Sequence, residues 1–137
     1  NFVELAGNIN RKMPIWIINQ SLIKNRKKLK ILLIGVSYKK NVGDTRESPA
    51  LDFIKILKKS GHIVNFYDPI VKKISSRKLK GEMRSIKLNL KNLKNHDLVY
   101  ILTNHSNINY RLIENHAKKI IDTRNVFKKK SIKINTL

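Results

Sequence analysis

The chain has 137 residues, with 30 Lys and Arg against 9 Asp and Glu, which gives a formal net charge of +21. This length fits one compact domain, and 41% hydrophobic residues can supply a core, so the composition is not that of a disordered chain. The sequence contains no cysteine, which excludes disulfides, thiolate metal sites and a cysteine nucleophile within these residues.

Membrane and export signals are also missing from the sequence. No apolar run approaches the roughly 18 residues that a membrane-spanning helix needs, and no signal-peptide pattern follows Asn1. We therefore predict a protein without a membrane partner and, by default, a cytoplasmic one. Because Asn1 is not a translation start, we expect a segment of the protein to precede it.

The net charge of +21 raises the question of nucleic-acid binding, because Lys and Arg bind phosphates without a sequence code. The chain contains 23 Lys, 20 Ile and 16 Asn, however, and all three residue types have A/T-rich codons. The lysines occur in scattered pairs and triples, which is typical of a solvated surface. A non-enzymatic basic module that binds nucleic acid or another polyanion is therefore the alternative function, and we expect nucleic acid not to be the main partner.

The first predicted element is a helix over residues 2–25, interrupted by Pro14. Its apolar residues are numerous enough to require a partner surface. That surface is either the core of this domain, or a missing domain or second subunit. The apolar positions that share one face are Phe2, Leu5, Ile9 and Met13.

A strand, a helix and a second strand follow. Residues 29–34 form a continuous apolar run that Gly35 ends, which is typical of a buried parallel strand. After a long loop, Ser48 suits a helix N-cap and Pro49 the first helical position. Gly61 ends this helix, and residues 62–67 form the second strand, so the segment predicts a right-handed βαβ unit.

The rest of the chain completes an open sheet. Residues 70–92 are basic and have no clear periodicity, so no element is predicted there. We predict a strand over 97–102, a helix over 108–117, a short strand over 120–122, and a loose or edge segment over 127–137. The fold class is therefore α/β, with a small, doubly wound, mainly parallel, Rossmann-like sheet. Ligands of such sheets bind beyond the carboxyl ends of the strands.

The loop that leaves the first strand, residues 35–48, is too long and polar to be a simple connection. It lacks the G-x-G-x-x-G pattern of dinucleotide-binding loops. Lys39, Lys40 and Arg46 instead accompany a helix N-terminus, which suits a diphosphate. The alternative is that Asp44 and Arg46 pair to fix the loop, with Lys39 simply solvated.

Two further strand ends carry polar groups. His105 follows the third strand and is either a general base or, as we favour, a hydrogen-bonding or capping residue. Arg124 follows the fourth strand, and its guanidinium can grip two anionic oxygens in a way that lysine cannot. Convergence of Lys39, Arg46 and Arg124 at one sheet edge predicts an anionic nucleotide or sugar phosphate as ligand, without indicating a reaction.

Several motifs, in order, resemble the C-terminal domain of the UDP-glucose/GDP-mannose dehydrogenase family. The resemblance spans nearly the whole chain and is weakest over residues 70–92. The sequences of the motifs around His105 and Arg124 are most similar to the branch of the family that oxidises UDP-N-acetylhexosamines, such as UDP-N-acetylglucosamine 6-dehydrogenase. The segments that carry it are Glu4-Leu5-Ala6-Gly7, Met13-Pro14, Gly35-Val36-Ser37-Tyr38-Lys39, Asp44-Thr45-Arg46-Glu47-Ser48-Pro49-Ala50, Gly61, Tyr67-Asp68-Pro69, Leu102-Thr103-Asn104-His105-Ser106 and Ile121-Asp122-Thr123-Arg124-Asn125.

The resemblance implies a role for particular residues. Tyr38 and Lys39 match the family's nucleotide-sugar-binding pair, and Arg124 matches its substrate-binding arginine. Arg46 matches an arginine that reaches NAD, a cofactor held mainly by an N-terminal domain. By the same resemblance, residues 1–25 are the end of the central linking and dimerisation helix, and residues 26–137 are the UDP-sugar-binding domain.

The resemblance also implies what the whole enzyme does. Family members carry out two successive NAD-dependent oxidations at C6 of a UDP-sugar, through a cysteine thioester, to give the uronic acid used in surface polysaccharides. Their partners are the UDP-sugar, the N-terminal NAD-binding domain and a second subunit in a homodimer. This chain lacks the cysteine and the NAD fingerprint, so we expect no catalytic residue and no metal site in it, and no activity from it alone.

Overall fold

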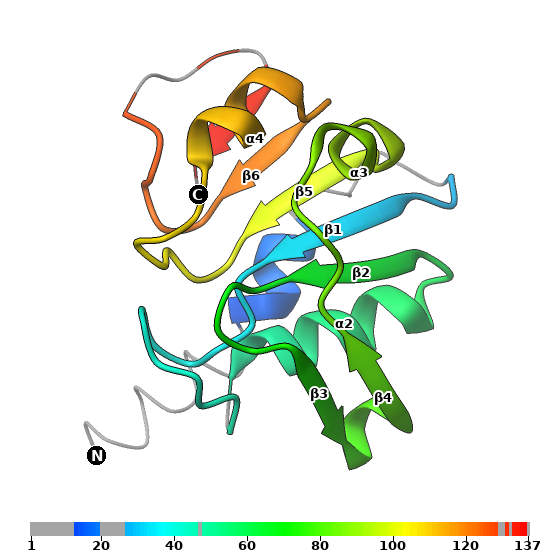
Figure 1. Ribbon diagram of the computed structural model, residues 1–137. Coiled ribbons are helices and arrows are strands. Elements are labelled where there is room, and N and C mark those ends of the chain that lie inside the picture. Colours follow the sequence, from blue (N-terminus) through cyan, green and yellow to red (C-terminus); the bar gives the residue numbers. More distant parts are fainter. Residues whose placement is uncertain (1–12, 20–26, 47, 129–130, 132, 137) are drawn as a thin grey trace, which may run out of the picture.

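The computed structural model describes residues 13–19, 27–46, 48–128, 131 and 133–136. Five strands form one parallel sheet in the order β2-β1-β5-β6-β7 (Figure 1). With helices on both faces, this is the Rossmann-like α/β fold predicted from the sequence. The strands are β1 Lys30–Ile34, β2 Ile63–Tyr67, β5 Leu98–Ile101, β6 Ile120–Asp122 and β7 Ile134–Thr136.

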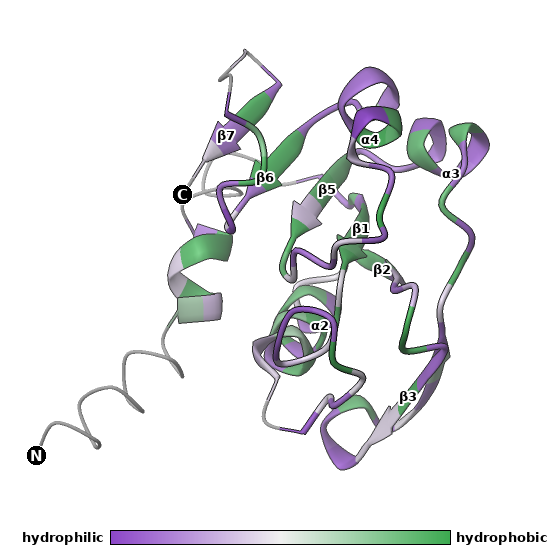
Figure 2. Ribbon diagram, turned by 60° about the vertical axis from the view of Figure 1, so that its left-hand side comes forward, coloured by the Kyte–Doolittle hydropathy of each residue, from purple (hydrophilic) through white to green (hydrophobic). Residues whose placement is uncertain are grey.

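The core has two layers because side chains along each strand alternate between the faces of the sheet. In β1, Ile31 and Leu33 belong to the cluster shared with α2, residues Pro49–Lys59, and with the helical residues 13–19. Leu32 and Ile34 belong to the cluster on the opposite face. There they meet Leu93 of α3, Leu90–Asn95, and Ile113 of α4, Tyr110–His116. Figures 1 and 2 show α3 and α4 across the sheet from α2. A strand buried on both faces explains the continuous apolar run of β1.

Helix α2 begins where the sequence predicts. The Oγ of Ser48 accepts a hydrogen bond from the N–H of Ala50 at 3.2 Å, and Pro49 is the first helical residue. The predicted inner positions Ala50, Ile54 and Leu57 are all buried. The N-terminus of α2 is thereby held at the edge of the sheet where β1 ends.

The helical residues 13–19 pack on the same face as α2. Ile17 and Ile18 are buried in the core, whereas Ile15 and Trp16 are about half exposed. The core of this domain is therefore one partner of the predicted apolar helix, and the helix also keeps an exposed apolar side. The rest of that predicted helix lies outside the described residues.

The middle of the chain, where no element was predicted, forms an antiparallel hairpin. Strand β3, Lys73–Ser76, pairs with β4, Gly81–Arg84, and a 3-10 turn, η1 Arg77–Leu79, joins them. Ile74 and Met83 anchor this hairpin to the cluster under α2. At the other end of the chain, β7 pairs with β6, which confirms the edge segment expected there.

Gly35 lets the chain leave β1 in close contact with the loop after β5. Its φ is +81°, a left-handed conformation that favours glycine. A Cβ at this position would lie 2.6 Å from both the Cβ and the carbonyl oxygen of Thr103. The approach of these two loops therefore depends on the missing side chain.

Candidate functional site

A pocket of about 470 Å³ opens beyond the carboxyl ends of β1, β5 and β6. The chain adds β2 on one side of β1 and later adds β5 on the other side, so the order in which strands are added reverses between β1 and β5. Open parallel sheets bind their ligands at such a switch point. The pocket is lined by Met13, Trp16, Ile17, Ser37, Ser48, Pro49, Ala50, Phe53, Leu102, Thr103, Thr123 and Arg124.

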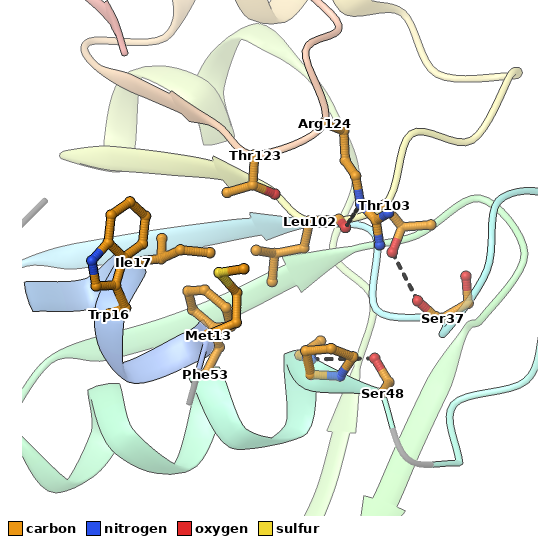
Figure 3. A pocket seen from close by; sticks show the side chains of 12 residues that line it. Met13, Trp16, Ile17, Ser37, Ser48, Phe53, Leu102, Thr103, Thr123 and Arg124 are labelled. Atoms are coloured by element: carbon orange, nitrogen blue, oxygen red, sulfur yellow. Dashed lines mark hydrogen bonds between the residues drawn. The ribbon is translucent and has the colours of Figure 1, made fainter. Parts of the chain in front are cut away.

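The pocket has a polar side and an apolar side. Figure 3 shows the side chains of Ser37, Thr103 and Arg124 gathered on one side, with Trp16 and Ile17 on the other. The polar side lies by the strand ends, and the apolar side is formed by the helical residues 13–19 together with the first turns of α2. Such a lining can take a ligand that joins an anionic group to an apolar ring.

Arg124 is the predicted site residue that lines this pocket. Its backbone N–H donates to the buried carboxylate of Asp122 at 3.0 Å, and its Nε donates to the carbonyl of Leu102 at 2.7 Å. These bonds hold the guanidinium across the end of β5. Within the described part of the chain, no carboxylate forms an ion pair with Arg124. A guanidinium oriented in this way is suited to an anionic ligand.

The other predicted residues lie in the loop between β1 and α2 and do not line the pocket. Tyr38 is 39% exposed, and Lys39 is also exposed. Arg46 pairs with Asp44, with 3.0 Å between Nη2 and Oδ2, so the pairing weighed in the sequence analysis is present. Hydrogen bonds from the side chain and backbone of Arg46 hold the pKa of Asp44 below its ordinary value of 3.8. The structure brings the predicted cations to one sheet edge, with only Arg124 at the pocket itself.

A buried hydrogen-bond network lies behind this loop. The Nε2 of His105 lies 3.0 Å from the Oδ2 of Asp68 and 3.0 Å from the Oγ of Ser37, and all three side chains are buried. The N–H of Asn41 donates to the Nδ1 of His105 at 2.8 Å. His105 therefore has the hydrogen-bonding role that the sequence analysis favoured over a general base.

The carboxylate of Asp68 is the centre of this network. Burial alone would raise the pKa of Asp68, but hydrogen bonds from the backbone N–H groups of Val36, Val71 and Ile70 and from His105 outweigh that effect. The pKa is held below 3.8, so the group is ionised at neutral pH. The sequence analysis included Asp68 in the Tyr67-Asp68-Pro69 motif but gave it no role, although its place directly after a strand was a usable signal.

The described residues contain neither a metal-binding cluster nor a membrane-spanning helix. Within them, no cluster of three or more His, Cys, Asp or Glu side chains is arranged to hold a metal ion. In the same residues, no helix has the length and apolar character needed to cross a bilayer.

The sequence was compared with models of known protein families, and one family matches. Residues 32–129 match the model of the UDP-glucose/GDP-mannose dehydrogenase family, UDP binding domain. The chain belongs to this family. Its match is to the UDP-binding C-terminal domain, as the sequence motifs indicated, and it includes the loop after β1, the pocket edge and Arg124.

Relatives and solved structures show the same family. A UDP-N-acetyl-D-mannosamine dehydrogenase of Methanococcus vannielii is 31% identical over 99% of this chain and 34% of its own length. The structure of the Pyrococcus horikoshii UDP-N-acetyl-mannosamine dehydrogenase is 28% identical, with a TM-score of 0.73, over 96% of this chain and 32% of that one. A Staphylococcus aureus enzyme of the same name is 30% identical, with a TM-score of 0.66, over 94% and 31%. The chain thus spans about a third of the length of these relatives.

Proposed function

We propose that this chain is the part of a nucleotide-sugar 6-dehydrogenase that holds the UDP portion of the substrate. The observation that carries the proposal is the placement of Arg124 in a pocket at the switch point of the sheet. The guanidinium fits the diphosphate, and the apolar wall made by Met13 and Trp16 fits a ring of the ligand. The match to the family's UDP binding domain supports the same conclusion.

Tyr38 and Lys39 complete this site in our proposal. Both lie in the loop that leaves β1, beyond the same sheet edge as the pocket, and both are exposed. Lys39 supplies a second cation for the diphosphate, and Tyr38 supplies a ring and a hydroxyl group. A ligand that reaches from the pocket to this loop would contact all three residues.

Arg46 is our candidate for a contact with NAD. Its side chain is 89% exposed and its partner Asp44 is 41% exposed, so a phosphate can replace this surface ion pair at little cost. Arg46 is the cation of this loop that we assign to NAD, and the loop lacks the glycine pattern of a dinucleotide site. NAD, which accepts hydride in such dehydrogenases, would therefore be held mainly by an N-terminal domain of the same enzyme.

The whole enzyme would oxidise C6 of a UDP-hexose or UDP-N-acetylhexosamine to the uronic acid for surface polysaccharides. The relatives named UDP-N-acetyl-D-mannosamine dehydrogenase favour an N-acetylated sugar. The nucleophilic cysteine that this reaction uses is not among these 137 residues, so another part of the enzyme supplies it. In this arrangement residues 1–25 end the linking helix of a homodimer, and residues 26–137 form the binding domain.

Calorimetric titration of the chain with UDP tests the proposal. We expect saturable binding that weakens roughly tenfold or more in both Lys39→Ala and Arg124→Ala, because each removes a charge-assisted contact. Lys94→Ala serves as the matched control. It removes an exposed cation of α3, a helix that does not line the pocket, and it should bind UDP as the unmodified chain does. A folded sample that does not bind UDP would overturn the proposal.

The same titration separates this function from a polyanion-binding module. Exposed lysines lie on α2, the β3–β4 hairpin, α3 and the segment after α4, so they surround the domain. Binding through many phosphate contacts would lose affinity steeply with salt, whereas a UDP site with two or three contacts would show a shallow slope. Tight binding of a DNA duplex with a steep salt slope, without saturable UDP binding, would favour the polyanion module.

A further inference from the structure

We propose that His105 is a positioning residue for the nucleotide-sugar site, holding the loop of residues 37–41 in the shape that presents Tyr38 and Lys39. This inference rests on the proposed function, since it concerns how that site is built. His105 is itself fully buried and does not line the pocket. It acts through the loop and not on the ligand.

The loop is fastened at both of its ends to the segment after β5. At one end, the hydroxyl of Thr103 donates to the carbonyl of Ser37 at 2.8 Å. At the other end, the side chain of Asn41 donates to the Oγ of Ser106 at 2.9 Å and accepts from its N–H at 2.8 Å. Tyr38 and Lys39 lie between these two fixed points.

The imidazole of His105 contacts both fixed points at once. Its Nδ1 accepts the N–H of Asn41, so Nδ1 carries no proton in this arrangement and the ring proton is on Nε2. The hydroxyl of Ser37 donates to the carbonyl of Lys39 at 2.9 Å, so its oxygen is left to accept from Nε2. One ring therefore sets the distance between Ser37 and Asn41.

Asp68 fixes the orientation of this ring. Its Oδ2 shares the Nε2 proton with Ser37 and also accepts the N–H of Val36 at 2.9 Å. Asp68 follows β2, His105 follows β5 and Ser37 follows β1, so the network joins three strand ends. The loop is thus held by the edge of the sheet before the ligand binds. Ligand binding therefore costs less conformational entropy of the loop.

The network is not a catalytic triad, although it contains Ser, His and Asp. In a triad the serine and the aspartate occupy opposite ring nitrogens. Here both lie on Nε2, and the other nitrogen is taken by a backbone N–H. With no exposed atom on the ring, a positioning role is the one that the geometry supports.

Two substitutions of His105 separate its role as a donor at Nε2 from its role as an acceptor at Nδ1. His105→Gln keeps an N–H donor near Asp68 and Ser37 but removes the acceptor for the N–H of Asn41. His105→Asn keeps an acceptor near Asn41 but leaves Asp68 and Ser37 without their donor. Each variant should weaken UDP binding roughly fivefold to tenfold, because one fixed point of the loop is released.

A matched control is His96→Gln. His96 is also buried and also uses both ring nitrogens, with Asn65 and the carbonyl of Asn92, but it precedes β5 at the opposite edge of the sheet. It should lower the thermal unfolding midpoint as much as His105→Gln does and leave UDP affinity unchanged. Equal loss of affinity in both variants would show a general effect of destabilisation and overturn the proposal.

A double-mutant cycle with Lys39→Ala is the deciding measurement. If His105 positions Lys39, the loss of affinity caused by Lys39→Ala should fall from roughly tenfold in the unmodified chain to about twofold in the His105→Gln background. If the two losses multiply, His105 does not act through Lys39. Should both His105 variants fail to fold, the cycle is run with Asn41→Gly, which suits the φ of +61°, keeps the N–H that bonds His105 and removes the side-chain bonds to Ser106. Losses that multiply in this cycle would overturn the positioning of Lys39 by the loop, on which the role of His105 depends.

The outcomes distinguish this inference from the proposed function. UDP binding that Arg124→Ala weakens, but that His105→Gln and His105→Asn leave unchanged, overturns the positioning role and leaves the UDP site standing. Absence of UDP binding in the folded, unmodified chain overturns the proposed function and the inference with it.

Discussion

Gly35 controls how closely the loop after β1 approaches the loop after β5. Because any Cβ there would meet Thr103 at 2.6 Å, Gly35→Ala should lower the free energy of unfolding by roughly 2–4 kcal/mol. Gly61→Ala is the control, since Gly61 also has a positive φ of +90° but no atom within 4 Å of the added Cβ. Its cost should be about 1 kcal/mol. Urea unfolding of both variants checks this, and equal costs would contradict the steric argument.

His62 should make the stability of the fold depend on pH. Its Nδ1 accepts the N–H of Leu29 at 3.0 Å, and burial lowers its pKa below the ordinary 6.5. The unfolded chain therefore takes up a proton more readily, so the contribution of His62 is present above pH 6.5 and is lost as the pH falls below it. Urea unfolding at pH 7.5 and 5.5 should show this loss. His62→Gln should show a smaller difference, and an unchanged difference would argue against His62 as the source.

The sequence indicated which strand ends carry the candidate cations, but it did not indicate how these cations are arranged. Lys39, Arg46 and Arg124 follow from charged residues at the ends of predicted strands, and the structure brings those ends to one edge. The Asp44–Arg46 ion pair is local and was one of the two alternatives that the sequence left open. The place of Arg124 at the pocket was not predictable, because its bond to the carbonyl of Leu102 joins residues 22 positions apart. The positioning role that we propose for His105 could not be predicted either, because it depends on contact with Asp68, which is 37 residues away in the chain.

At the scale of the elements, prediction succeeded where one local signal dominated. Helix α2 has an N-cap, a proline and an apolar stripe, and β1 has a continuous apolar run. The hairpin was missed because β3 and β4 are four residues each and mostly polar. It is stabilised by contact with α2 through Ile74, Leu79 and Met83, which no local pattern reveals.

The hairpin provides a test of that explanation. Ile74 is 3% exposed within the main core, so Ile74→Ala should cost roughly 2–4 kcal/mol of unfolding free energy. Lys78 joins the hairpin to Asp52 of α2 by a surface ion pair of 3.1 Å, and Lys78→Ala should cost less than about 1 kcal/mol. Chemical denaturation measures both. A larger cost for Lys78→Ala would mean that charge and not apolar packing holds the hairpin to α2.

At the scale of the whole molecule, the order of strands and helices was sufficient to predict the doubly wound sheet. Two features could not be read in this way: the parallel pairing of β7, whose three residues carry no pattern of their own, and the pocket, whose apolar side comes from residues 13–19 far away in sequence. The net charge of +21 gave the least information, because the lysines surround the domain and few of them lie near the pocket.

The most direct test of the central proposal is to locate UDP on the chain by NMR. In a titration of the ¹⁵N-labelled protein with UDP, the amide signals of Lys39, Thr103 and Arg124 should move together and saturate. Thr103 and Arg124 line the pocket, and Lys39 lies in the loop that leaves β1 at the same sheet edge. Signals of the β3–β4 hairpin should stay in place. Shifts confined to the hairpin, or no saturable shift at all, would contradict a UDP site at the carboxyl edge of the sheet.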